Sequence, residues 1–190
     1  MNLIKSLKDN EIARRYILIN GFDGILTILG IVIASFVGGF KEPKLILFPV
    51  FGATIAMAIS GSFGALFAEL AEQKKQLKEL EKHLLSSLKN THLEKRRKFI
   101  AVLIALLDGA TPLFFSLVLI FPFIFASFKL ISIALAYVLF FAFTMISLSF
   151  LGFLTAKISK DDYFLHVLRM LGTGFVIGVI FYLLKIGNLF

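Results

Sequence analysis

The 190-residue sequence contains no cysteine, which excludes disulfide bonds, thiolate metal sites and cysteine nucleophiles. It also lacks a glycine-rich phosphate-binding loop and an HExxH zinc motif. Its three histidines are scattered, and no Ser/His/Asp constellation has supporting sequence context. We therefore expect a protein that is not an enzyme and that carries no prosthetic group.

Long stretches of the chain lack charge almost entirely. Apolar residues make up 58% of the sequence, with 23 phenylalanines, and they gather in five runs at about 16–40, 45–68, 99–128, 130–156 and 164–184. Each run meets or exceeds the ~20 residues that a helix needs to cross a hydrocarbon core about 30 Å thick. The sequence predicts an all-α, multi-pass membrane protein with five transmembrane helices in a single membrane domain, 1–190.

Basic residues are scarce in every second connection between these runs. Of the 20 lysines and arginines, 16 lie in residues 1–15, 69–98 and 157–169, and the alternate connections hold the other four. Because cytoplasmic connections carry the excess of lysine and arginine, the N-terminus is predicted to be cytoplasmic and the C-terminus outside, in the cell membrane if the chain is prokaryotic. The net charge of +8 then reflects topology and contact with the lipid bilayer, and we expect no nucleic-acid partner.

The sequence also predicts the structure of the segments that flank the first two apolar runs. Residues 1–15 should form a short cytoplasmic or interfacial helix, and the first apolar run is too long for a cleaved signal peptide, so it should act as an anchor. The second helix should continue into the cytoplasm to about Leu88, because no glycine or proline interrupts residues 65–88. The rest of the segment 69–98 should be a short polar connection.

The second apolar run carries small residues at a spacing of four. Small residues at this spacing allow two helices to approach closely in a membrane. The residues concerned are Gly52, Ala56, Ser60, Gly64 and Ala68. The stripe predicts either a homodimer interface or close packing within one chain.

Two aspartates lie inside apolar runs. Asp23 is the only charged residue between Tyr16 and Phe40, and Asp108 lies in the third run. An aspartate at the centre of a membrane helix costs about 2.5–3.5 kcal/mol on insertion scales, so such residues usually face a bundle interior or a water-filled cavity and mark an ion path. Both lie roughly 10–14 Å from the cytoplasmic end, which predicts facing positions. The alternative is a pair of protonated or hydrogen-bonded aspartates with no transport role.

Other candidate ligands accompany the two aspartates. Asn20 and Thr27 share a helical face with Asp23. Pro112 lies four residues after Asp108 and cannot donate to its carbonyl, which leaves a backbone oxygen able to coordinate a cation or bond to Thr111 or water. Oxygen ligands of this kind suit hard or borderline divalent cations.

A second set of candidate ligands lies beyond the second apolar run. Acidic residues and a histidine follow one face of the predicted helix: Glu69, Glu72, Glu79 and His83. They would gather cations at the cytoplasmic mouth of a pathway, or they form a solvated face whose charge nearby lysines offset. Within the second run, Met57 would add a softer ligand or serve only in packing.

Four stretches resemble, in order, spans of the vacuolar iron transporter family. These are "RRYILINGFDGILTILGIVIAS", "AISGSFGALFAELAE", "LDGATPLFFSLVLIFPF" and "LRMLGTGFVIGVIFYLLKIG", which resemble the first, second, third and fifth spans. The resemblance implies a homodimer that exports Fe²⁺, and also Mn²⁺, from the cytoplasm in exchange for protons, with Asp23 in the pathway. The chain departs from that family at Gly61, where a methionine is usual, at Ala65, where an acid is usual, and in lacking most of the cytoplasmic metal-binding domain.

Other functions stay open at this point. A membrane scaffold or subunit that keeps the fold without transporting metal is favoured by Gly61 and Ala65. Two membrane aspartates also occur in intramembrane aspartyl proteases, but the GxGD sequence of that class is absent. Transport of a different solute is a further alternative.

Overall fold

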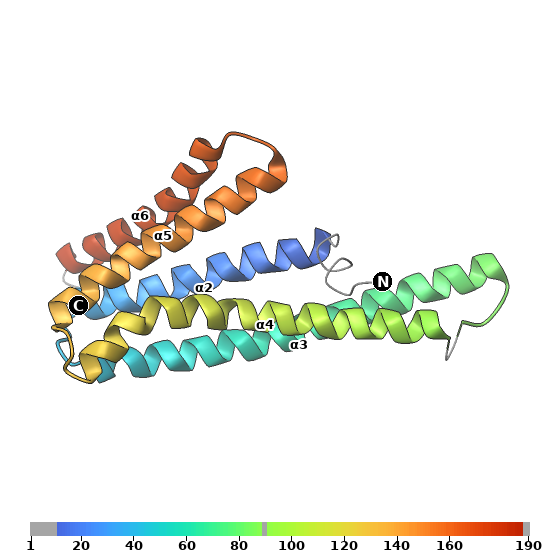
Figure 1. Ribbon diagram of the computed structural model, residues 1–190, viewed down its shortest axis with the longest axis horizontal. Helices are drawn as coiled ribbons and strands as arrows, with labels where there is room; N and C mark the ends of the chain where they lie inside the picture. The colour runs from blue at the N-terminus through green and yellow to red at the C-terminus, as the bar shows by residue number, and fades with distance from the viewer. Residues whose placement is uncertain (1–10, 89–90, 188–190) are drawn as a thin grey trace.

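A computed structural model of the protein describes residues 11–88 and 91–187. These residues form five α-helices and no strand: α2 (Glu11–Val37), α3 (Pro43–Leu84), α4 (His92–Ser127), α5 (Ile133–Ser159) and α6 (Tyr163–Ile186) (Figure 1). All five are long and apolar enough to cross a membrane. The all-α prediction and the five candidate spans are thereby confirmed, and the fold indicates a multi-pass membrane protein.

Helix α2 begins earlier than the apolar run that predicted it. It starts at Glu11, so residues 11–15 of the predicted interfacial helix are its first turns, and residues 1–10 lie outside the described part of the chain. The turn into α3 passes through Gly39, whose φ of 71° suits a residue without a Cβ. Pro43 then opens α3, where its missing N–H has no helical partner to lose.

Helices α3 and α4 run side by side in opposite directions and extend past the rest of the bundle as a hairpin (Figure 1). Helix α3 ends at Leu84, about one turn before the predicted end at Leu88, because Leu85 adopts a left-handed conformation with φ 50°. The chain turns back there, and Glu81 Oε1 accepts the Leu88 N–H at 2.7 Å.

The second arm of this hairpin is the first part of α4, where the sequence predicted a short polar connection. Helix α4 starts at His92 rather than near residue 99, because Thr91 Oγ1 accepts the Glu94 N–H at 3.3 Å and caps the helix. The Thr91-x-x-Glu94 spacing is that of a capping box, a signal for an earlier helix start that the sequence analysis did not use.

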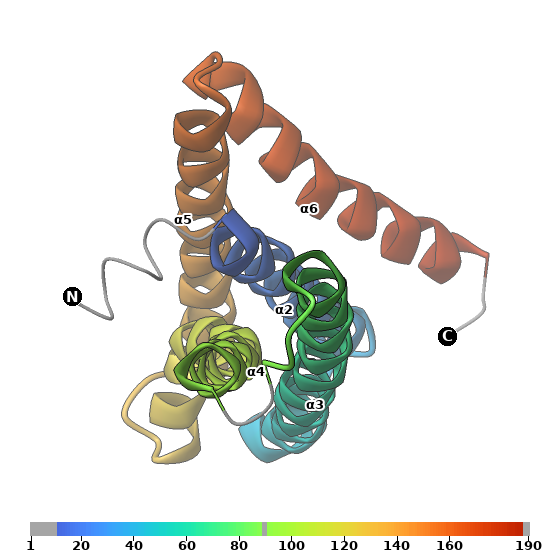
Figure 2. The same cartoon turned by 90° about the vertical axis from the view of Figure 1, so that its right-hand side faces the viewer.

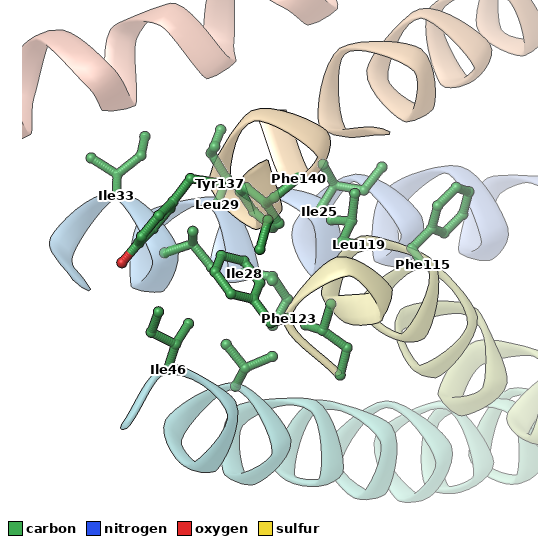
Figure 3. Close-up of a cluster of buried hydrophobic side chains, with 14 of the residues drawn as sticks. Ile25, Ile28, Leu29, Ile33, Ile46, Phe115, Leu119, Phe123, Tyr137 and Phe140 are labelled. Carbon is green, nitrogen blue, oxygen red and sulfur yellow. The ribbon is translucent and has the colours of Figure 1, made fainter. Parts of the chain in front are cut away.

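Helix α2 occupies the middle of the bundle and contacts all four other helices. It lies between the α3–α4 pair and the α5–α6 pair (Figure 2). Buried isoleucine, leucine and phenylalanine side chains of α2, α4 and α5 form the main apolar cluster: Ile25, Ile28, Leu29, Leu119, Phe123 and Phe140 (Figure 3). Helix α6 leans away from the others, and only 6% of its most apolar window is buried.

Candidate functional site

Helices α2 and α3 border an open groove of about 550 Å³, with Pro112 of α4 also lining it. Four residues that the sequence singled out as candidate ligands line this groove: Asn20, Asp23, Thr27 and Met57. The first three lie on one helical face of α2 by their spacing of three and four residues. Met57 belongs to α3, so folding alone brings it beside them.

Asp23 lies on the groove wall rather than in the bundle interior. Both Asp23 and Thr27 are exposed in the single chain, so of the two predicted settings, a bundle interior or a water-filled cavity, Asp23 does not have the first. The inward-facing side of α2 is instead taken by apolar residues such as Ile25 and Ile28, which are fully buried. The Asp23 carboxylate is thus open to whatever enters or covers the groove.

Asp108 has the opposite surroundings. It is 3% exposed, and its Oδ1 accepts a hydrogen bond from Nδ2 of Asn20. The same Nδ2 donates to the Tyr16 carbonyl oxygen at 3.2 Å. Both amide hydrogens of Asn20 therefore have acceptors within the chain, and its Oδ1 is left as the acceptor atom of a groove-lining side chain. Asn20, rather than Asp23, is the neighbour that Asp108 meets on α2.

Glycines allow three helices to come together around Asp108. A Cβ placed on Gly61 of α3 would lie 3.2 Å from Asp108 Oδ2, and one placed on Gly24 of α2 would lie 3.1 Å from Pro112 Cα. Either distance is tighter than ordinary van der Waals contact, so larger residues would force the helices apart. Gly61 is thus a position on α3 that faces the buried aspartate.

Pro112 leaves the Asp108 carbonyl without its helical donor, and Thr111 was one of the predicted replacements. Helix α4 continues through Pro112, which cannot donate to the Asp108 carbonyl. Thr111 Oγ1 donates to the Leu107 carbonyl at 2.6 Å, so it does not serve Asp108. The Asp108 carbonyl oxygen lies 3.6 Å from the position of a Cβ on Gly61, at the contact between α3 and α4.

The acidic stripe beyond the second span divides into a buried and an exposed part. Glu69 is 6% exposed and shares a side-chain hydrogen bond with Tyr16. Glu72, Glu79 and His83 are exposed. Tyr16 therefore connects Glu69 of α3 to Asn20, through the backbone carbonyl that Asn20 contacts. Tyr16 was not among the predicted site residues, although its spacing of four residues from Asn20 places it on the same helical face.

The ligand set of the groove is sparse in charge. Across the described residues, no three histidine, aspartate or glutamate side chains lie close enough together to hold a metal ion. The groove offers one carboxylate, an amide oxygen, hydroxyls and a thioether, from Asp23, Asn20, Thr27, Ser60 and Met57. One chain alone thus provides a partial coordination shell for a cation.

The small-residue stripe of α3 lies at the surface. Gly52, Ala56, Ser60, Gly64 and Ala68 are all exposed, and a Cβ on Gly52 or Gly64 would meet nothing within 4 Å. Close packing within the chain, one of the two predicted roles, is therefore not what these residues do. Ala56 and Ser60 also line the groove, so the stripe and the groove share one face of the molecule.

Comparison with known proteins adds a distant similarity. No protein-family model matches the chain, and no solved structure matches it. The chain is 28% identical over 182 residues to a protein of Methanocaldococcus jannaschii whose name states only that it is uncharacterized. The alignment covers 93% of this chain and 91% of that protein, so the similarity extends over nearly the full length of both and assigns no activity to either.

Proposed function

We propose that the chain is a homodimeric transporter of divalent metal cations, Fe²⁺ and also Mn²⁺, which exports them from the cytoplasm in exchange for protons. The observation that best supports this proposal is the groove in which Asn20, Asp23, Thr27 and Met57 meet. Oxygen ligands with one thioether suit a borderline divalent cation. The choice of metal, the direction and the proton exchange rest on the resemblance to the vacuolar iron transporter family.

The proposed orientation follows from the distribution of basic residues. The basic α3–α4 hairpin lies on the cytoplasmic side with the N-terminus, and the C-terminus lies outside, in the cell membrane if the chain is prokaryotic. In this orientation Glu69 and Tyr16 lie on the cytoplasmic side of Asn20 and Asp108. A cation from the cytoplasm would meet these groups before it reached Asp23.

The homodimer is supported by the open side of the groove. An ionised Asp23 facing hydrocarbon would cost about 2.5–3.5 kcal/mol, whereas a second copy packed on the same face would exclude lipid from it. The exposed small residues of α3 allow such a copy to approach closely. A two-fold interface would bring a second Asp23 and a second Met57 to the groove and complete the sparse ligand set.

The chemistry of the proposed site is a competition at carboxylates. A divalent cation binds the ionised form of Asp23, and a proton binds the same oxygens, so cation release favours proton uptake. Asn20 contributes its Oδ1, because its amide hydrogens are held by Asp108 and the Tyr16 carbonyl. The buried Asp108 thereby orients one of the ligands of the groove.

Asp23→Asn tests this proposal. Asparagine keeps the shape of the side chain but removes its charge, so we expect Mn²⁺ or anaerobic Fe²⁺ uptake into proteoliposomes to fall ~100-fold while the protein stays folded. Asp161→Asn, the same chemical change in the connection between α5 and α6, is the matched control and should retain uptake. Uptake that survives Asp23→Asn would exclude Asp23 as the coupling site.

A membrane scaffold or subunit without transport is the second candidate function. It is favoured by glycine at position 61 and alanine at position 65, and by the lack of a three-ligand acidic or histidine cluster in the described residues. This candidate predicts no thermal shift with Fe²⁺, Mn²⁺, Co²⁺ or Zn²⁺. A metal-dependent shift that Asp23→Asn removes would count against it.

A further inference from the structure

The α3–α4 hairpin contains a second cavity, separate from the groove. Its volume is about 370 Å³, and four basic side chains line it: Lys74 and Lys78 of α3, and Arg97 and Lys98 of α4. Leu70 and Leu77 of α3 contribute apolar surface to the same cavity. A basic cavity with an apolar wall suits an anion that also carries hydrocarbon.

The two acidic residues that line this cavity, Glu81 and Glu94, both have partners within the hairpin. Glu94 Oε1 pairs with Lys98 Nζ at 2.7 Å. Glu81 Oε1 accepts the Leu88 N–H at 2.7 Å and the Ser87 hydroxyl at 3.4 Å, at the end of the hairpin. Within residues 11–88 and 91–187, Lys74 and Lys78 form no ion pair. Four basic and two acidic side chains line the cavity, so it keeps an excess of positive charge.

Arg97 adds to this excess because its partners are neutral. Its Nη1 donates to Gln76 Oε1 at 3.2 Å and to Gln73 Oε1 at 3.5 Å, across the gap between the two helices. Two amide oxygens hold the guanidinium in place without cancelling its charge. A planar guanidinium held in this way presents its remaining N–H donors in the fork that matches a phosphate group.

The position of the cavity distinguishes a lipid from a soluble anion. Leu70 follows the second apolar run, which ends near residue 68, and Lys98 immediately precedes the third run at residue 99. The residues that line the cavity thus begin at the edge of the proposed membrane region and continue away from it along the α3–α4 hairpin. A headgroup phosphate can lie among the basic side chains there while its acyl chains stay in the bilayer.

We propose that this cavity binds the headgroup of one anionic phospholipid per chain, with its phosphate held by Lys74, Lys78 and Arg97. The site does not depend on the proposed transport function, since none of its residues lines the groove. It is a defined site rather than a diffuse basic surface, because these cations converge on one cavity while Lys75, Lys95 and Arg96 of the same hairpin do not line it.

Native mass spectrometry of the full chain in detergent tests the proposal, with phosphatidylglycerol or phosphatidylcholine added. We expect one tightly held phosphatidylglycerol per chain and no comparable retention of phosphatidylcholine. A basic residue near an anionic lipid contributes about a five-fold gain in affinity, so K74Q/K78Q/R97Q should bind phosphatidylglycerol ~100-fold more weakly. The control K75Q/K95Q/R96Q removes the same charge outside the cavity and should lose far less.

A second variant guards against a folding defect in the triple mutant. Because Arg97 bridges the two helices, K74Q/K78Q leaves that bridge intact and should still weaken binding about 25-fold. Equal loss in the pocket and control variants would overturn the proposal in favour of diffuse surface charge. Equal retention of phosphatidylcholine would also overturn it, as would displacement of the lipid by low millimolar inorganic phosphate, which would identify the site as one for a soluble anion.

Discussion

Asp23 and Asp108 have similar sequence settings but different surroundings in the folded chain. Each is an aspartate followed by glycine inside an apolar run. Asp108 is buried, accepts a hydrogen bond from Asn20 and lies against Gly61. Asp23 is exposed and lines an open groove. A buried, partnered carboxylate contributes to the structure of one chain, whereas an open one is available to a ligand or to a second copy.

The same contrast applies to the small residues around the two aspartates. Gly24 and Gly61 are tightly packed against α4, whereas Gly52 and Gly64 of α3 touch nothing within 4 Å. Tight glycines hold α2, α3 and α4 together near Asp108. Open ones lie on the face that carries the groove, so substitutions on the two sides should have different consequences.

The largest expected effect on stability comes from filling a tight glycine. Gly24→Leu would place a side chain against the Pro112 backbone, so we expect a loss of about 3 kcal/mol or more. Gly64→Leu meets open space and should leave the folded chain unchanged while lowering the dimeric fraction. Thermal unfolding followed by circular dichroism measures the first effect, and light scattering on the detergent-purified protein measures the second. Equal stability of the two variants would show that Gly24 is no more tightly packed than Gly64.

The next largest difference in stability is expected between alanine substitutions of the two aspartates. Asp108→Ala leaves the Asn20 amide without its buried acceptor, which should lower the free energy of unfolding by about 1–3 kcal/mol. Asp23→Ala removes an exposed side chain and should change stability by about 0.5 kcal/mol or less. Chemical denaturation in detergent compares the two variants, and a larger loss for Asp23→Ala would reverse the assignment of structural and open roles.

A smaller effect on stability is expected from the contact between Tyr16 and the buried Glu69. Tyr16→Phe removes the hydroxyl that bonds the buried Glu69 carboxylate, so we expect a loss of about 1 kcal/mol. Tyr163→Phe makes the same change at an exposed position and is the control. Unfolding midpoints that coincide for the two variants would show that the Tyr16–Glu69 contact contributes nothing measurable.

The smallest effect concerns the connection between α5 and α6. The Asp162 backbone N–H, with His166 as a lesser cause, holds the pKa of Asp161 below its usual value of 3.8. Because the folded-state pKa is lower, this group stabilises the fold above its unfolded pKa, and the contribution is lost as the pH falls through the folded value. Asp161→Asn should therefore lower the unfolding midpoint by only ~1 °C at pH 6, and the difference should shrink as the pH falls through the folded-state pKa, which thermal unfolding at a series of pH values measures.

Much of the fold follows from local sequence. The apolar runs predicted all five helices, because burying a helix in a membrane needs about 20 apolar residues in succession and little else. The boundaries were less predictable, because they depend on single residues. Leu85 ends α3 by adopting a left-handed backbone conformation, and Thr91 starts α4 by capping it. The pattern of apolar residues predicts neither boundary.

The candidate site was predictable as a set of residues but not as an arrangement. The spacing of Asn20, Asp23 and Thr27 placed them on one face of a helix, and Met57 was selected for its chemistry alone. Their convergence in one groove depends on how α2 and α3 pack. The predicted facing pair of aspartates was replaced by an Asn20–Asp108 contact, since a small rotation of a helix decides which side chain points inward.

By itself the sequence determined that this chain is all-helical and suited to a membrane, and it determined which side chains carry polar chemistry inside it. Those features follow from composition and helical period, which act on neighbouring residues. The tertiary structure alone decided that Asp108 is buried beside Asn20 and Gly61, that Asp23 opens onto a groove, and that Lys74, Lys78 and Arg97 share a cavity. Such contacts join different helices, so they depend on how the helices pack, as where Gly24 and Gly61 bring α2 and α3 against α4.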